Sequence, residues 1–265
     1  MAQLTNEIAL VTGATGGLGR IIALTLARRG AAVAVHGRDD ERGARLVADI
    51  RHSGGTADFF AADLTSSDAA TRMVDAVVST FGRLSILVNS AYASDDMADD
   101  ASVGEITDEA WDNILTGNLT TSLWVTRAAL TTMTERGRGS IVNISARAGV
   151  VGTPGMAAHA ASKGAINALT RSIAVDYADR GIRCNAVVPG HILHEVRDAN
   201  ASAERIASLE AMQLTRLATP EDVANSVAFL AGPDAEVLTG VLLPVDGGST
   251  AARAAVVGGP DPRCS

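Results

Sequence analysis

The amino-acid sequence predicts an α/β fold, a doubly wound parallel sheet with helices on both faces. Short apolar runs rich in β-branched residues alternate with helical patterns along the chain, and this alternation implies a parallel sheet. The content of 47% hydrophobic and 20% charged residues is typical of a soluble globular protein. No internal repeat or linker-like composition interrupts the pattern. We therefore predict one domain over residues 1–249, followed by a poorly ordered tail over residues 250–265.

The first strand is expected at residues 8–12, directly before the glycine-rich segment 13–19 and a helix that continues to Arg29. A buried strand that leads through a glycine turn into a helix leaves backbone N–H groups free to bind a phosphate, and the helix dipole assists. A glycine turn alone is a weak signal, because ordinary tight turns use the same residues. The order of strand, turn and helix favours a phosphate site.

The later elements follow from apolar runs and helix-capping residues. Thr65 and Ser66 can cap one helix, Thr107 caps another, and Thr219 precedes a proline at a first helical position. The acidic segment 95–105 is expected to be a loop, and segment 191–217 is expected to be less regular. Further strands are expected at 32–36, 57–61, 86–89, 140–145, 183–188 and 241–245. Helices are expected at about 40–52 and 67–81, from the glycine crossing to about 180, and from 219. The helix capped by Thr107 is expected to lead into a long helical tract with Asn118 near its middle.

The charge and the cysteine content exclude several classes of protein. The net charge is −8, from 22 basic and 30 acidic residues without a basic cluster, so nucleic acid and anionic membranes are not expected partners. We find no leader pattern and no apolar run long enough to span a bilayer, so we expect a cytoplasmic location. Cys184 and Cys264 are far apart and suggest neither a disulfide framework nor a metal site.

Lys163 is the only lysine in the chain, against twenty-one arginines. It lies in segment 140–166, which is predicted to contain a strand, a glycine-rich crossing and a helix that carries His159 one turn before the lysine. A small ammonium group at this position indicates that a point charge is needed there rather than a planar guanidinium. The alternative is that a single lysine has survived by chance.

These motifs together resemble the short-chain dehydrogenase/reductase family over residues 6–249. The resemblance implies a single-domain Rossmann-like fold, with a dinucleotide site at the carboxyl ends of the strands, a small-molecule substrate and a homo-oligomer, either a tetramer or a dimer. The matching motifs are Thr12-Gly13-x-x-x-Gly17-x-Gly19, Asp63-Leu64, Asn89-x-Ala91, Asn118, Lys163, Pro189-Gly190 and Val245-Asp246-Gly247-Gly248. The cofactor-binding residues that it implies are Gly13, Thr15, Gly17, Leu18, Gly19, Arg38, Asp63, Leu64, Asn89, Ala91, Lys163, Pro189, Gly190 and Ile192.

The end of the second strand bears on the choice of cofactor. An acidic residue there would accept hydrogen bonds from a ribose diol, whereas an arginine would neutralise a 2′-phosphate. Arg38 therefore favours NADP(H) over NAD(H). Two observations oppose this choice. Arg38 could instead pair with Asp39 or Asp40 on the surface, and the glycine turn has Thr15-Gly16 where many NADP-dependent relatives carry a basic residue.

The chain departs from the family where the reaction takes place. The resemblance implies a relay of a tyrosine four residues before the lysine, a serine thirteen residues before that tyrosine, the lysine, and an asparagine on the preceding long helix. Lys163 and Asn118 match, but His159 and Ala146 occupy the tyrosine and serine positions. The catalytic residues that we expect are therefore His159, Lys163 and Asn118.

Other departures lie nearby. Tyr92 replaces a small glycine and should crowd the nicotinamide, and His194, with His191 close by, replaces a threonine. Tyr92 is also the one phenol that could enter the pocket, because Tyr177 lies at a helix end and looks structural. Ser145 precedes the vacated serine position but should face the other way, because consecutive strand residues face opposite sides. Nothing in the histidine spacing requires a metal ion, so no metal site is expected.

His159 can take part in proton transfer because it shares a helix face with Lys163. A nearby ammonium should keep the imidazole neutral, which makes it a good proton acceptor, whereas as a donor it must first be protonated. The first hypothesis is an atypical NADP(H)-dependent oxidoreductase for a carbonyl or alcohol of a small, secondary-metabolite-like substrate. The alternatives are non-redox chemistry (dehydration, cyclisation or isomerisation) with His159 as base, a polar remnant in a silent site, and a catalytically silent subunit.

Overall fold

A computed structural model of the protein describes residues 4–93, 96–193 and 201–251, apart from the side chain of Asp96. Its centre is a seven-stranded parallel sheet in the order β3-β2-β1-β4-β5-β6-β7. The order reverses between β1 and β4, which is the doubly wound arrangement that the sequence predicts. The strands are β1 (Ile8–Val11), β2 (Ala32–Gly37), β3 (Thr56–Ala61), β4 (Ile86–Asn89), β5 (Gly139–Ile144), β6 (Ile182–Pro189) and β7 (Leu242–Val245).

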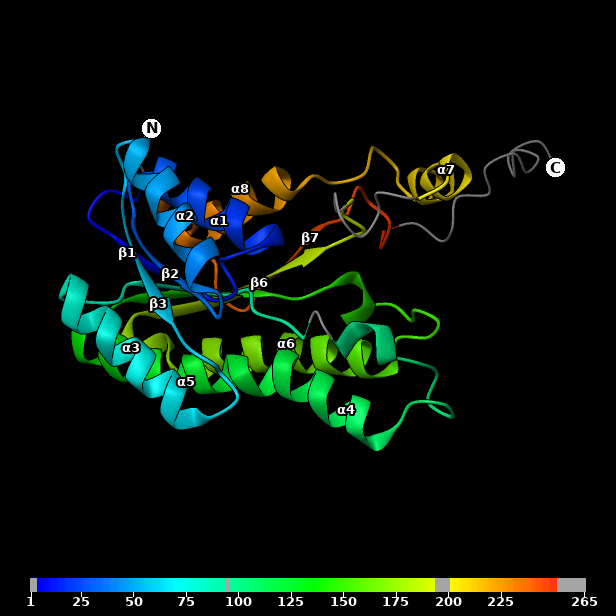
Figure 1. Ribbon diagram of the computed structural model, residues 1–265, viewed down its shortest axis with the longest axis horizontal. Coiled ribbons are helices and arrows are strands. Elements are labelled where there is room, and N and C mark those ends of the chain that lie inside the picture. The colour runs from blue at the N-terminus through cyan, green and yellow to red at the C-terminus, as the bar shows by residue number, and fades with distance from the viewer. Residues whose placement is uncertain (1–3, 94–95, 194–200, 252–265) are drawn as a thin grey trace.

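Helices cover both faces of the sheet (Figure 1), with α1, α2 and α8 on one face and α3, α5 and α6 on the other. Two further helices, α4 and α7, also lie among the described residues. The helices are α1 (Gly17–Arg28), α2 (Asp40–His52), α3 (Ser67–Phe81), α4 (Asp108–Leu115), α5 (Thr121–Arg136), α6 (Ala157–Asp176), α7 (Ala203–Ala211) and α8 (Pro220–Ala231).

The strands β1 to β6 each contribute side chains to two separate cores. In β1, Ala9 and Val11 pack with the cluster under α1, α2 and α8, while Ile8 and Leu10 pack with the cluster under α3, α5 and α6. This follows from the geometry of a strand, whose successive side chains point to opposite faces. The buried, apolar strands hold the chain segments that follow them at one edge of the sheet.

The predicted caps are present at the starts of three helices. The side chains of Ser66, Thr107 and Thr219 each accept a hydrogen bond from the backbone N–H three residues later. These caps are predictable because donor and acceptor lie within one turn of sequence. The predicted long helical tract with Asn118 near its middle is present, and the structure adds that a π-helical segment, Thr116–Thr120, joins α4 to α5 within it.

Several expected boundaries shift by a residue or more. The helix after the glycine crossing ends at Asp176, and a short 3₁₀ turn at residues 178–180 follows it. Segment 191–217 contains the regular helix α7. Residues 252–265 of the predicted tail lie outside the described residues, so its expected disorder stays a prediction. Within the described ranges, the structure contains no helix both long and apolar enough to cross a membrane.

Candidate functional site

The residues predicted to bind a cofactor follow the carboxyl ends of the parallel strands. Because all strands point the same way, the segments after β1, β2, β4, β5 and β6 meet at one edge of the sheet. Thr12 Oγ1 accepts hydrogen bonds from the backbone N–H groups of Ser90 and Ala91, at 3.0 and 3.1 Å. The glycine turn after β1 is therefore tied directly to the segment after β4, a strand that ends at the buried Asn89.

The glycine turn has no room for a side chain at Gly13 or Gly19. Gly13 has φ +65°, and a Cβ atom on it would lie 2.9 Å from Ala91 Cα. A Cβ atom on Gly19 would lie 2.3 Å from the carbonyl oxygen of Gly13. No side chain caps the N-terminus of α1, because its N-cap residue is Gly16, and the first turn carries no acidic residue. The backbone at this helix N-terminus can therefore approach an anion closely, so it fits a dinucleotide pyrophosphate.

Within this turn, Gly17 has φ +49° and is the first residue of α1, directly before Leu18. The side chain of Thr15 packs on the end of β2, because a Cβ atom on Gly37 would lie 2.2 Å from Thr15 Cγ2. Arg38 follows Gly37 and is exposed. The predicted phosphate turn and the predicted cofactor-selecting arginine are therefore neighbours.

Asp39, one of the two carboxylates considered as surface partners of Arg38, has a structural role. Its Oδ1 accepts a hydrogen bond from the backbone N–H of Arg42 at 3.0 Å and caps α2. Its Oδ2 lies 3.1 Å from the Arg42 guanidinium. Asp39 thus belongs to the start of α2.

His36 is a buried residue of this region that the sequence analysis did not single out. Its Nδ1 accepts a hydrogen bond from the backbone N–H of Gly13 at 3.1 Å, and its Nε2 lies 3.1 Å from the carbonyl oxygen of Ala62. A carbonyl only accepts, so the proton is on Nε2. Burial lowers the pKa of His36 from 6.5 to about 4. The neutral ring therefore links the glycine turn to the end of β3. The sequence signal that could have identified this residue is a histidine inside an otherwise apolar strand.

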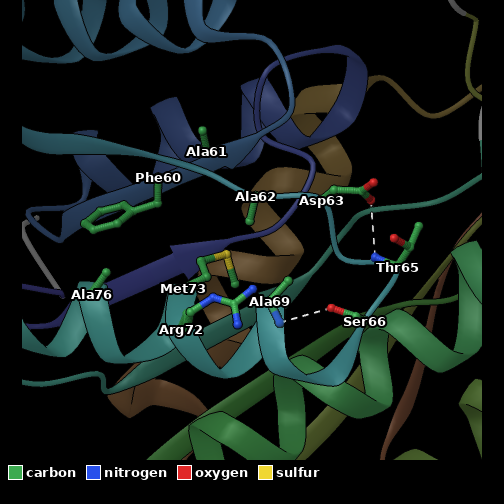
Figure 2. A pocket seen from close by; sticks show the side chains of 10 residues that line it. All are labelled: Phe60, Ala61, Ala62, Asp63, Thr65, Ser66, Ala69, Arg72, Met73 and Ala76. Atoms are coloured by element: carbon green, nitrogen blue, oxygen red, sulfur yellow. Dashed lines mark hydrogen bonds between the residues drawn. The ribbon is translucent and has the colours of Figure 1, made fainter.

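Asp63 lies at the surface, whereas the next residue, Leu64, lies in the core. Asp63 Oδ1 accepts a hydrogen bond from Thr65 N at 3.2 Å, and Leu64 is buried in the cluster under α3. Figure 2 shows Asp63 at the edge of a pocket of about 590 Å³ between β3 and α3. A second pocket of the same volume is lined by Ser85, Ser140 and neighbours at the opposite, amino ends of the strands. Neither pocket is lined by His159 or Lys163.

The three predicted catalytic residues come together around α6. Asn118 is fully buried in the π-helical segment, and its Oδ1 accepts a hydrogen bond from the backbone N–H of Ala93 at 2.9 Å. Its amide nitrogen Nδ2 lies 3.3 Å from His159 Nδ1 and donates to Ser162 Oγ at 3.0 Å. Single π-helical turns inside helices are frequent at functional sites. Here the turn presents the Asn118 side chain to α6.

These contacts select one tautomer of His159. An amide nitrogen only donates, so His159 Nδ1 must accept, and the ring proton is on Nε2. The pKa of His159 is lowered from 6.5 to about 4. Burial is the largest cause, the positive charge of Lys163 also lowers the pKa, and the carboxylate of Asp100 acts in the opposite direction. His159 is therefore neutral near pH 7 and has a donor at Nε2.

Lys163 lies in the interior with 5% of its surface exposed. Its Nζ donates a hydrogen bond to the carbonyl oxygen of Ile144 at 2.9 Å, and burial lowers its pKa from 10.5 to about 8. Ser145 Oγ donates to the backbone carbonyl oxygen of Lys163 at 3.3 Å. Ser145 is thus used in packing β5 against α6, which agrees with the prediction that it does not replace the serine missing at Ala146.

The predicted residues that follow β4 and β6 differ in their exposure and in their contacts. Tyr92 is 54% exposed and directly precedes Ala93, the residue bonded to Asn118. After Pro189, the backbone N–H of Gly190 donates to Val245, and Ile192 pairs with Ala218 in an isolated bridge. His194 lies outside the described residues.

Two expectations concern residues without a role in the reaction. Tyr177 packs against the core under α6, and the Arg180 guanidinium lies 5.3 Å from its ring centre, which confirms a structural role. Among the described residues, no group of three or more His, Cys, Asp and Glu side chains could hold a metal ion.

Comparisons with known proteins extend over nearly the whole chain. Residues 13–250 match the sequence profile of a family described as Enoyl-(Acyl carrier protein) reductase. A protein named 2-(S)-hydroxypropyl-CoM dehydrogenase 3, from Xanthobacter autotrophicus, is 38% identical over 255 residues, which cover 94% of this chain and 98% of that protein.

Solved structures are also similar to this chain over nearly its whole length. A gluconate 5-dehydrogenase from Burkholderia cenocepacia, in complex with NADP and tartrate, has a TM-score of 0.89 at 29% identity and covers 95% of this chain and 98% of its own. A 7α-hydroxysteroid dehydrogenase complexed with NADH and 7-oxo glycochenodeoxycholic acid has a TM-score of 0.86 at 28% identity and covers 93% of this chain and 95% of its own. The similarity therefore includes the segments that carry Asn118, His159 and Lys163.

Proposed function

Because this chain belongs to the short-chain dehydrogenase/reductase family, we propose that it is an NADP(H)-dependent oxidoreductase that interconverts a carbonyl and an alcohol, with His159 in place of the family's tyrosine. The names of its relatives are those of dehydrogenases and reductases, which supports oxidoreductase chemistry. The hydrogen bond between Asn118 and His159 Nδ1 carries the finer part of the proposal. It leaves Nε2–H, a hydrogen-bond donor, as the polar group that the ring can offer to a substrate.

The dinucleotide, when bound, supplies or takes up the hydride. In the direction of reduction, the neutral His159 ring first takes up a proton from solvent, and its Nε2–H then donates a hydrogen bond to the carbonyl oxygen and transfers its proton as the carbon gains the hydride. The new C–H and O–H bonds thus use one hydride and one proton, and the ring returns to its neutral form. Lys163, one turn along the same helix, favours the less positive form of the ring. Asn118 holds the ring in the donor orientation throughout.

The preference for NADP(H) depends on Arg38. A guanidinium at the end of β2 can form charge-assisted hydrogen bonds with a 2′-phosphate, whereas a ribose diol would need an acidic partner there. The related gluconate 5-dehydrogenase was solved with NADP, and the related 7α-hydroxysteroid dehydrogenase with NADH. Both cofactors therefore occur among the structural relatives, and Arg38 supports NADP(H) for this chain. We further propose a small-molecule substrate and a homo-oligomeric assembly.

The test is cofactor-dependent turnover by the purified protein. NADPH and NADH oxidation would be followed over a panel of carbonyl compounds, and the reverse reaction over a panel of alcohols, from mildly acidic to alkaline pH. General acid–base groups contribute about 10²–10⁴-fold, so His159→Ala should lower kcat by at least about 100-fold. His52→Ala is the matched control, since His52 is an exposed histidine at the end of α2. Binding of NADPH without turnover on any compound would overturn the proposal.

A non-redox reaction is the second candidate, favoured by the same neutral ring of His159. An imidazole whose pKa is lowered to about 4 stays neutral at pH 7, and its Nε2–H can donate a hydrogen bond to a substrate oxygen during dehydration or isomerisation without a redox step. Stoichiometric change of the cofactor with product formation would exclude this second candidate.

A further inference from the structure

The start of α6 is capped by a distant residue. The N-cap residue, Met156, makes no side-chain hydrogen bond. Instead, Asp100 Oδ1 accepts from the backbone N–H of Ala158 at 3.1 Å, and its Oδ2 accepts from the backbone N–H of His159 at 3.0 Å. The backbone N–H of Ala157 donates to the carbonyl oxygen of Ala101 at 3.1 Å. Segment 100–101 thus satisfies three consecutive N–H groups of the helix that carries His159.

The capping in five other helices is local. The caps of α2, α3, α4, α7 and α8 are side chains that accept from a residue three positions later. Asp100, in contrast, lies 58 and 59 residues before its two partners. It belongs to the connection between β4 and α4, the same connection that carries Tyr92 and Ala93. One carboxylate therefore joins this connection to the first turn of α6.

The charge of Asp100 acts on the same ring. A carboxylate at a helix N-terminus interacts favourably with the helix dipole. It also raises the pKa of His159, against burial and the ammonium of Lys163, which lower it. From the π-helical segment the ring meets the neutral Asn118. The charged groups that act on His159 are thus Asp100 from the loop and Lys163 from its own helix.

We propose that Asp100 is a positioning residue for His159, which it holds in register with Asn118 through two backbone N–H groups while its negative charge balances the ammonium of Lys163. This inference rests on the proposed function of His159 as the group that exchanges a proton with the substrate. Asp100 does not touch the reacting atoms. It acts by keeping the imidazole in the Nε2–H tautomer and in the right place.

The test combines ¹⁵N spectra of the histidine rings with steady-state kinetics, for the wild type, Asp100→Asn and Asp99→Asn. Asp99 is an exposed carboxylate next to Asp100 and is the matched control. The His159 signals are assigned by their absence in His159→Ala. In the wild type and in Asp99→Asn at neutral pH, we expect the two His159 nitrogens to give the separate shifts of a pure Nε2–H tautomer. In Asp100→Asn the shifts should move toward the average of two tautomers.

The kinetic result should separate positioning from cofactor binding. Misplacement of a catalytic group costs up to about 100-fold in rate, so we expect kcat to fall by at least about tenfold in Asp100→Asn, with KM for NADPH within about twofold. Asp100→Glu keeps the charge and should recover part of kcat. If Asp100→Asn is too unstable to study, Asp100→Ser retains one acceptor for the helix N-terminus and answers the same question.

A pure Nε2–H tautomer and an unchanged kcat in folded Asp100→Asn would overturn the inference. The spectra need no turnover, so failure of the proposed function and failure of this inference are distinguishable. A wild-type protein without cofactor-dependent activity refutes the function, and the tautomer of His159 in Asp100→Asn still decides the role of Asp100.

Discussion

Asn118 Nδ2 lies 3.3 Å from His159 Nδ1, and the backbone N–H of Ala93 fixes which end of the amide faces the ring. This relationship makes the tautomer of the histidine a property of the fold. It also places the only ring proton of the neutral form on Nε2, the nitrogen on the other side of the ring from Asn118.

Asn118→Asp should reverse this preference. A carboxylate facing Nδ1 can only accept, so the ring would carry a proton on Nδ1, and the negative charge would favour the imidazolium. An opposite charge at this distance raises a histidine pKa by about 1–3 units. We therefore expect the pH dependence of reduction to shift to higher pH in Asn118→Asp.

The measurement is the profile of kcat against pH, with Asn113→Asp as control because Asn113 is exposed on α4. An identical profile in wild type and Asn118→Asp would show that Asn118 does not control the ring.

Arg38→Ala should weaken NADPH binding more than NADH binding. A hydrogen bond to a charged group contributes about 1.5–3 kcal/mol, which corresponds to at least about tenfold in affinity. The dissociation constants of both cofactors can be measured by the quenching of protein fluorescence. Arg45→Ala is the control, because Arg45 is an exposed arginine of α2 that pairs with Glu41. Equal losses for NADPH and NADH would remove Arg38 as the basis of cofactor choice.

His36→Gln tests the link between the glycine turn and β3. The amide of the introduced glutamine can replace one or both hydrogen bonds of the histidine ring, but it does not titrate. The pKa of His36 is lowered from 6.5 to about 4 in the folded protein, so in this range the unfolded chain binds more protons and the stability that the neutral ring contributes is lost as pH falls.

The difference in free energy of unfolding between wild type and His36→Gln should therefore change in favour of the variant as pH falls from 6.5 to 4. Urea unfolding at several pH values measures it, with His52→Gln as the exposed control. A difference independent of pH would mean that His36 is protonated to the same extent in both states.

Lys163→Met removes the only lysine and leaves the carbonyl oxygen of Ile144 without this donor. An unsatisfied buried acceptor costs about 1–3 kcal/mol. The pKa of Lys163 is lowered from 10.5 to about 8, so between these values the unfolded chain binds more protons and the stability contributed by Lys163 rises with pH.

Each pKa unit corresponds to about 1.4 kcal/mol. We expect the stability of the wild type relative to Lys163→Met to increase by about 1–3 kcal/mol between pH 8 and 10.5. A relative stability that is flat or falls across this range would contradict the assignment of a depressed pKa to Lys163.

The sheet and most helix boundaries were predictable because their signals are local. A parallel strand such as β4 is an apolar run, and caps such as Thr107 and Thr219 act within one turn. The catalytic positions of Asn118, His159 and Lys163, in contrast, were assigned from the resemblance to the family and not from local signals.

The missed features depend on contacts between distant segments. His36 matters because Gly13 and Ala62 lie on either side of it, and Asp100 matters because its loop reaches α6. The π-helical segment at Asn118 leaves no trace in the sequence, since the helical pattern continues through it. Tertiary packing decides such features, and periodicity and propensity do not report it.

The most direct test of the central claim is the fate of deuterium carried at C4 of the NADPH nicotinamide. If His159 supports hydride transfer, the product alcohol gains one deuterium at the former carbonyl carbon for each NADPH oxidised. The same label should then appear at least about 100-fold more slowly with His159→Ala. Product formed without deuterium and without NADPH oxidation, or label transferred equally fast by His159→Ala, would contradict this account.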